Sequence, residues 1–127
     1  MPKSCLATAA FVAALAFAVP ADAFLAKNGL VVEPSGTQFD VPYRGQSGAR
    51  AFWCAAADYA VHALGAKPAT RIWRMSEPPR RSGQGITFSL SSEGAAQSTG
   101  LAIFGGRGAS LTVAHADLLC EPLSILD

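Results

Sequence analysis

The 127-residue sequence predicts an α+β fold: one helix packed on a mainly antiparallel sheet of five or six strands, with a disulfide bond. Three observations lead to this prediction. An alanine-rich segment, 49–64, has the apolar spacing of an amphipathic helix. Several short segments around it alternate polar and apolar residues, as strands with one solvated face do. Two cysteines, Cys54 and Cys120, lie in the helical segment and near the carboxyl terminus.

The first 23 residues have the three parts of a Sec-type signal peptide. These parts are a cation at Lys3, an apolar run from Leu6 to Val19, and a small-residue exit at Ala21, Asp22 and Ala23. A membrane anchor is the alternative, but a bilayer span needs roughly 20 apolar residues. Pro20 and Asp22 interrupt this run too early. We therefore expect cleavage after Ala23, a periplasmic or secreted product, and no membrane span after cleavage.

The mature chain, Phe24 to Asp127, has the size of a single small domain. Cleavage removes one cation, Lys3, and one anion, Asp22, so the net charge stays at +1. A nearly balanced charge argues against nucleic acid and against general polyanion binding. The sequence contains no cofactor motif, and we expect no cofactor.

The first half of the mature chain predicts a β-hairpin followed by the helix. Leu30–Glu33 and Gln38–Val41 favour strands around a turn at Pro34–Thr37. Ser47 is the expected helix cap, and Gly65 is the expected stop after Leu64. The expected core face follows helical spacing and is listed here: Ala49, Trp53, Ala56, Ala60 and Leu64, widened by Phe52, Tyr59 and Ala63.

The second half predicts the remaining strands. Segments 70–75 and 86–90 alternate polar and apolar residues, and the prolines at 78 and 79 end the first of them. Segments 101–104 and 109–115 are expected to form a hairpin around the glycine-rich turn at 105–108, whose spacing does not match a phosphate-binding loop. Segment 117–120 is expected to form a helical turn or another strand.

The cysteines predict a structural disulfide. Cys5 leaves with the signal peptide, so Cys54 and Cys120 remain, and thiols in an oxidising compartment usually pair. The bridge would close a loop of about 66 residues, for which the chain-entropy model gives about 4 kcal/mol of stabilisation.

A catalytic alternative uses the same cysteine. The stretch from Cys54 to Gly65 resembles the nucleophile helix of NlpC/P60 cysteine peptidases, in which a cysteine opens a helix that ends near Leu-Gly. The resemblance implies Cys54 as nucleophile and His115 as its base. That family commonly has Asp before the cysteine and Ser-Gly after it, whereas Trp53 precedes Cys54 and two alanines follow it. We therefore expect a disulfide and no catalytic residues.

A metal site is a further alternative, because Cys54, Asp58 and His62 recur at four-residue intervals and would share one helix face. His115 or Cys120 could add a fourth ligand. Since a bridged cysteine cannot bind metal, we expect no metal site and a polar helix face partly covered by the carboxyl-terminal segment.

A basic stretch between Lys67 and Arg81 is the candidate binding region. Its members are Arg71, Trp73, Arg74, Arg80 and Arg81. Arginine beside an exposed aromatic ring can bind phosphate, an anionic lipid or a glycan. The simpler interpretation places Arg71 and Arg74 partly on the solvated side of a strand and the other two arginines in a loop.

The mature chain as a whole, with Phe52–Ala60 at its centre and Leu118–Glu121 near its end, resembles small exported proteins of Rhodobacter-like alphaproteobacteria that have no assigned activity. The resemblance implies paired cysteines and a periplasmic or secreted location. We expect a non-enzymatic binding, accessory or inhibitory module whose partner is an envelope protein or an anionic envelope polymer. The alternative is a periplasmic Cys–His hydrolase acting on cell-wall peptides.

Overall fold

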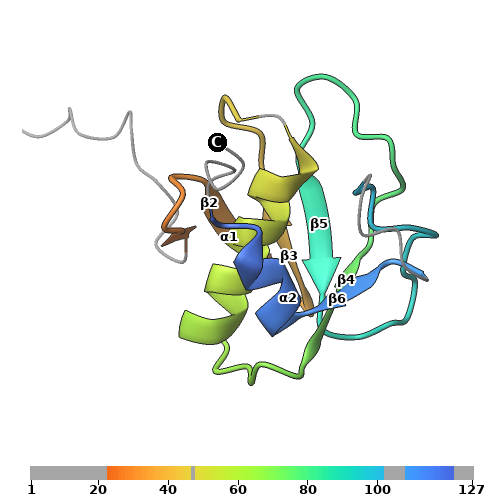
Figure 1. The fold of residues 1–127 in the computed structure, drawn as a ribbon. Coiled ribbons are helices and arrows are strands. Elements are labelled where there is room, and N and C mark those ends of the chain that lie inside the picture. The colour runs from red at the N-terminus through yellow and green to blue at the C-terminus, as the bar shows by residue number, and fades with distance from the viewer. Residues whose placement is uncertain (1–22, 47, 102–107, 122–127) are drawn as a thin grey trace, which may run out of the picture.

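The computed structural model describes residues 23–46, 48–101 and 108–121, so most of the expected signal peptide lies outside it. Within these ranges the chain forms a six-stranded antiparallel sheet and two helices (Figure 1). The strands are β1 (Phe24–Leu25), β2 (Val31–Ser35), β3 (Gln38–Val41), β4 (Arg71–Arg74), β5 (Ile86–Ser89) and β6 (Ser110–Thr112). The helices are α1 (Ala49–His62) and α2 (Val113–Leu118). The predicted α+β fold is confirmed, with a second short helix added.

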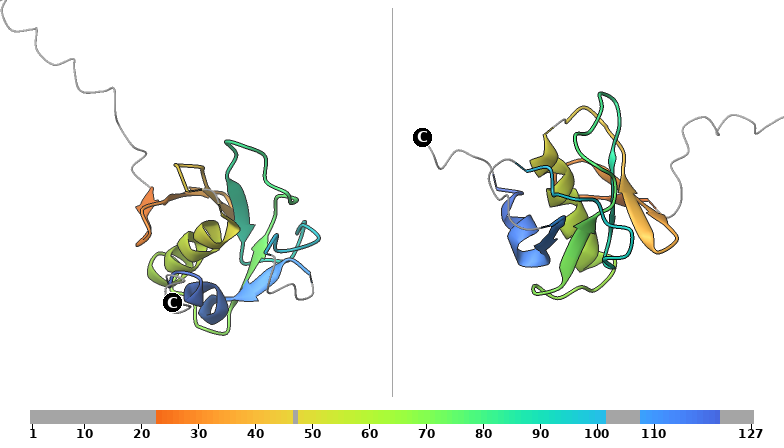
Figure 2. Two further views of the ribbon diagram at one scale, coloured as in Figure 1. Left: turned by 45° about the horizontal axis from the view of Figure 1, so that its top comes forward. Right: turned by 90° about the vertical axis from the view of Figure 1, so that its right-hand side faces the viewer.

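The sheet, with strand order β1-β2-β3-β5-β4-β6, curves around the two helices (Figure 2). Phe39 of β3 lies opposite Phe88 of β5, and both side chains face α1. Trp53 meets the Phe88 ring edge to face at 4.8 Å, and Tyr59 lies 4.8 Å from the Phe39 ring. These aromatic pairs form the centre of the core, and such contacts add to the free energy gained by burying the rings.

Helix α1 is buried on all sides between Phe52 and Ala60. The sheet covers one side of it, and α2 packs against another. A helix enclosed in this way needs small side chains where its neighbours approach, and the alanines at 55–57 provide them. The alanine-rich composition is therefore a packing requirement as well as a source of helix propensity.

The ends of α1 differ from the sequence prediction. Gly48 is the N-cap and no side chain caps the helix, while Ser47 lies outside the described residues. The helix ends at His62, before the predicted Leu64. The chain turns away at Gly65, whose φ of +69° is the left-handed conformation that glycine tolerates. Leu64 is consequently 45% exposed and Ala63 is exposed as well, so the assignment of these two residues to the core face was wrong.

The predicted hairpin is confirmed as β2 and β3. Ser35 pairs with Gln38, which leaves Gly36 and Thr37 as the loop, and Gly36 has a φ of +68°. The turn is thus tighter than predicted, and Pro34 belongs to β2. Strand β1, which pairs antiparallel with the start of β2, was not predicted.

The predicted strand at 109–115 is partly wrong. Strand β6 covers only Ser110–Thr112, and the chain then passes directly into α2. The side-chain oxygen of Thr112 accepts a hydrogen bond from the backbone N–H of His115 at 3.1 Å, which caps the helix at its first turn. Strand β6 pairs with β4. The predicted strand at 101–104 and its glycine turn fall largely on residues 102–107, outside the described part.

We predict that Phe88→Ala lowers the free energy of unfolding by about 3–5 kcal/mol, because it removes a fully buried ring and leaves a cavity. Leu118→Ala is the matched control, since Leu118 is 63% exposed and should change stability by less than about 1 kcal/mol. Urea unfolding followed by circular dichroism measures both variants. Equal effects in the two variants would contradict the assigned core.

Candidate functional site

The predicted disulfide between Cys54 and Cys120 is present, with an S–S distance of 2.09 Å. It joins the buried face of α1 to the segment that follows α2. A bridged sulfur carries no thiolate, so Cys54 in this state is neither a nucleophile nor a metal ligand. His115, the proposed base, lies on α2 and is half-buried.

The candidate ligand Asp58 has a structural role in α1. Asp58 is only 6% exposed, and its carboxylate accepts a hydrogen bond from the backbone N–H of Lys27 at 2.8 Å. Its other oxygen lies 2.9 Å from Nδ1 of His62, whose side chain is 65% exposed. Asp58 thus holds the turn between β1 and β2 against the helix. In residues 23–46, 48–101 and 108–121, no three His, Cys, Asp or Glu side chains gather as metal ligands would.

A hollow of about 310 Å³ lies beside this pair, lined by residues of both helices. Lys27 and Asp117 meet across it, with Nζ and Oδ1 3.1 Å apart and both side chains half exposed. An ion pair with this exposure contributes roughly 0–1 kcal/mol. The hollow therefore contains charges of both signs, and its one lysine is already paired with Asp117.

The structure separates the arginines of the predicted binding stretch. Arg71 is exposed and its Nε donates to Oγ of Ser110 at 2.8 Å. Arg81 is exposed in the loop after β4, and Trp73 is half-buried. None of these three residues lines the pocket that Arg74 and Arg80 share. The expectation that Arg74 lies partly on the solvated side is wrong, because Arg74 pairs with Phe88 and is 2% exposed.

The guanidinium group of Arg74 is incompletely paired. Its Nε donates to the carbonyl of Ser76 at 2.6 Å, and Nη1 donates to the carbonyl of Thr99 at 3.2 Å. The same Thr99 carbonyl accepts the indole N–H of Trp53 at 3.1 Å. Nη2 is buried and has no hydrogen-bond partner among the described residues. Burial lowers the pKa of Arg74; the nearby carboxylate of Glu77 raises it, and the charge of Arg80 lowers it.

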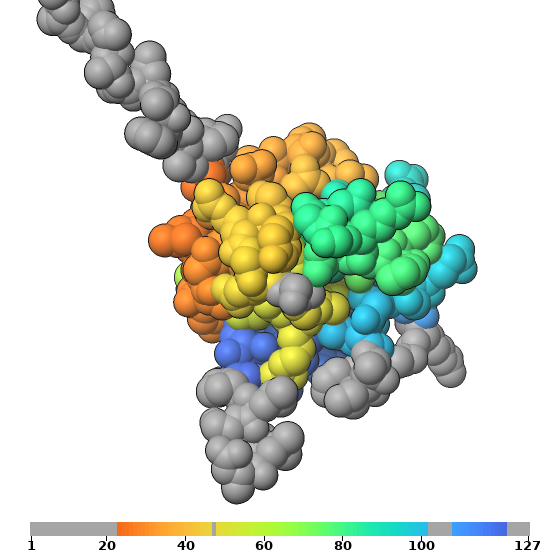
Figure 3. All heavy atoms as spheres, turned by 90° about the horizontal axis from the view of Figure 1, so that it is seen from above, coloured from red at the N-terminus to blue at the C-terminus, as the bar shows by residue number. Residues whose placement is uncertain are grey.

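Arg74 and Arg80 line one pocket of about 190 Å³, which we call the arginine pocket. Its remaining walls are uncharged and comprise Ala49, Pro78, Pro79, Ile86 and Gly100. Ala49 is the first residue of α1, and Figure 3 shows the start of this helix beside the loop that leads into β5 and the segment before residue 102.

The guanidinium carbon of Arg80 lies 5.1 Å from the ring centre of Phe52 and 5.4 Å from that of Tyr43. The aromatic rings at this arginine are therefore not Trp73, the ring that sequence analysis associated with the basic stretch. Nη1 of Arg80 also donates to the carbonyl of Gln84 at 2.7 Å. These contacts hold the Arg80 side chain in place at the arginine pocket.

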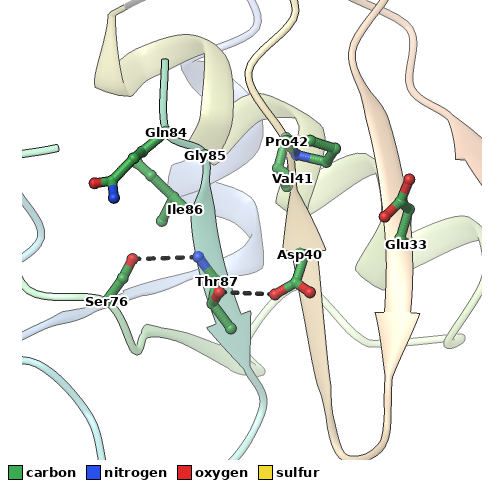
Figure 4. A pocket seen from close by; sticks show the side chains of 9 residues that line it. All are labelled: Glu33, Asp40, Val41, Pro42, Ser76, Gln84, Gly85, Ile86 and Thr87. Atoms are coloured by element: carbon green, nitrogen blue, oxygen red, sulfur yellow. Dashed lines mark hydrogen bonds between the residues drawn. The ribbon is translucent and has the colours of Figure 1, made fainter. Parts of the chain in front are cut away.

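A third hollow, of about 430 Å³, lies on the sheet between β2, β3 and β5 (Figure 4). Glu33 and Asp40 are directly opposite one another in the strand register. Asp40 accepts a hydrogen bond from Oγ1 of Thr87 at 2.7 Å, and Ser76 accepts one from the backbone N–H of Thr87 at 3.3 Å. Sequence reasoning missed this hollow, although the strand alternation already places Glu33 and Asp40 on the polar face.

Comparison of the chain with family models, curated proteins and solved structures gave no match. The similarity to small exported alphaproteobacterial proteins therefore stays a prediction from the sequence. Neither α1 nor α2, in the described part of the chain, has the length and apolar character that crossing a bilayer requires.

We predict that Asp58→Ala destabilises the protein by about 1–3 kcal/mol, because the Lys27 N–H loses its buried acceptor. His62→Ala should cost less than about 0.5 kcal/mol, since its exposed ring can exchange Asp58 for water. Thermal unfolding with and without a chelator tests both. If the two substitutions had equal effects that the chelator reproduced in the unmodified protein, Asp58 and His62 would be metal ligands.

Proposed function

We propose that this protein is exported and works as a non-enzymatic binding module, accessory or inhibitory, toward a component of the cell envelope. The observation that carries the proposal is the Cys54–Cys120 bridge. Such bridges persist in oxidising compartments outside the cytoplasm. The bridge also occupies the one residue that the sequence offered as a nucleophile.

The arrangement of the chain supports a binding module in a second way. The aromatic core, the closed hairpin and the bridge make a rigid scaffold, and the hollows lie at its surface between loops and strand faces. Rigid scaffolds that position loop and edge residues are common in binding proteins, because little conformational entropy is lost on association. An envelope protein or an anionic envelope polymer remains the proposed partner.

The alternative, a Cys–His hydrolase acting on cell-wall peptides, requires a free Cys54 thiolate beside His115. The bridge would have to be reduced, and kept reduced in an oxidising compartment, before such an enzyme could act. Cys54 is also only 1% exposed, so its surroundings would have to open before a substrate could reach the sulfur. The binding proposal needs neither step.

We predict that protein recovered from a periplasmic extract starts at Phe24 and takes up an alkylating reagent only after reduction. Intact-mass spectrometry with and without prior reduction measures cleavage and thiol state together. The Cys120→Ser variant is the control, because its unpaired Cys54 must alkylate in denaturant without a reductant. A mass that includes residues 1–23 would contradict export with cleavage. Alkylation of the native protein without reduction, together with peptidoglycan hydrolysis, would favour the hydrolase.

A further inference from the structure

We propose that the arginine pocket binds a carboxylate group carried on a small apolar residue, as at the carboxyl end of a peptide. The proposal deepens the binding function proposed above and rests on it. Its starting point is Arg74, which is 2% exposed and whose Nη2 lacks a hydrogen-bond partner anywhere in the described chain. A buried cationic donor left unpaired is costly, and native structures supply such groups with water or a ligand.

The pocket provides the space and the charge for an anion. Its volume of about 190 Å³ is several times the roughly 30 Å³ that one water takes in the liquid. Arg74 and Arg80 both line it, and their charges are close enough for Arg80 to lower the pKa of Arg74. The first residue of α1, Ala49, is also part of the wall, so the positive end of a 14-residue helix lies at the same place.

The charge balance favours one negative charge over two. Glu77 is near enough to Arg74 to raise its pKa, so the surroundings combine two cations with one anion. A carboxylate matches the remaining single positive charge, whereas a doubly charged phosphate would exceed it. The planar guanidinium group of an arginine also suits a carboxylate, which accepts charge-assisted hydrogen bonds from it.

The uncharged walls favour an apolar group next to the carboxylate. The pocket is lined by Pro78, Pro79 and Ile86 together with Ala49. A side chain as small as alanine fits the available volume and would contact these apolar walls. A peptide terminus, from an envelope protein or a cell-wall peptide, therefore matches the pocket better than an anionic polymer.

The hydrogen bonds also provide a spectroscopic reporter of binding. Arg74 and Trp53 donate to the same Thr99 carbonyl. A ligand that reorients the guanidinium group removes one of the two donors from this carbonyl and so alters the hydrogen bond of the Trp53 indole N–H. The indole N–H signal of Trp53 should therefore shift when the pocket is occupied. The N–H signal of Trp73, which is not part of this network, serves as the internal reference.

We test the proposal by titrating the oxidised, isotopically labelled protein with N-acetyl-alanine and recording the two indole signals. We expect a saturable shift of the Trp53 signal, and at least a tenfold weaker response to the uncharged N-acetyl-alanine amide. Both ligands act on unmodified protein, so this comparison does not depend on any variant folding. No saturable shift, an equal response to the amide, or tighter binding of inorganic phosphate than of N-acetyl-alanine would overturn the proposal.

Three variants locate the site. Arg74→Met keeps a long unbranched apolar stem and removes the charge, and Ala49→Leu retains Arg74 but narrows the pocket. Each should weaken binding at least tenfold. Arg81→Gln, which changes the net charge as Arg74→Met does but lies outside the pocket wall, should stay within twofold of the unmodified protein. Loss of binding in Arg81→Gln equal to that in Ala49→Leu would overturn the assignment.

A failure of carboxylate binding in protein that is exported and oxidised would leave the proposed function standing.

Discussion

Every other feature of this fold depends on the enclosure of α1. Its residues from Phe52 to Ala60 are all buried, so each side of the helix must be matched by a neighbouring element. The curved sheet supplies one side and α2 another. The polar residue within this stretch, Asp58, is retained because it pairs with the Lys27 N–H and so anchors the turn between the first two strands. The helix therefore organises both the core and the surface hollows around it.

The same enclosure explains why an arginine lies inside the domain. Strand β4 must present Ile72 to the core, and the two-residue period of a strand then places Arg74 on the same face. In this position the side chain of Arg74 donates hydrogen bonds to the carbonyls of Ser76 and Thr99. A neutral side chain of similar length would satisfy the packing. Packing alone therefore does not explain why Arg74 is charged.

The sequence could predict the features that depend on local pattern. Gly36 marks the hairpin, the alanines mark the helix, and the loss of Cys5 with the leader leaves Cys54 and Cys120 as natural partners. It could not predict which side of β4 faces inward, because Ile72 and Trp73 are adjacent and both apolar. Pairing with β5 decides this question, and pairing is a long-range property.

The start of helix α2 at Val113, within a segment expected to be a strand, escaped prediction for a similar reason. The β-branched residues Thr112 and Val113 favour a strand, yet Thr112 also has the side chain of a helix cap. The segment forms a helix and not a strand because, as a helix, it packs against α1. In the candidate site, sequence reasoning identified Arg74 and Arg80 among five residues. It could not exclude Arg71 and Arg81, because separating these arginines requires the course of the loop after β4.

The direct passage from β6 into α2 has a consequence for oxidative folding. Because Thr112 both ends the strand and caps the helix, the register of β6 fixes the rotational position of α2. A slip of one residue in the strand would move its side chains to the opposite face of the sheet and displace the start of the helix with them. Cys120 would then be carried away from Cys54. The covalent bond is thus geometrically available to chains whose edge strand has paired in the native register, and oxidation selects that register from the alternatives.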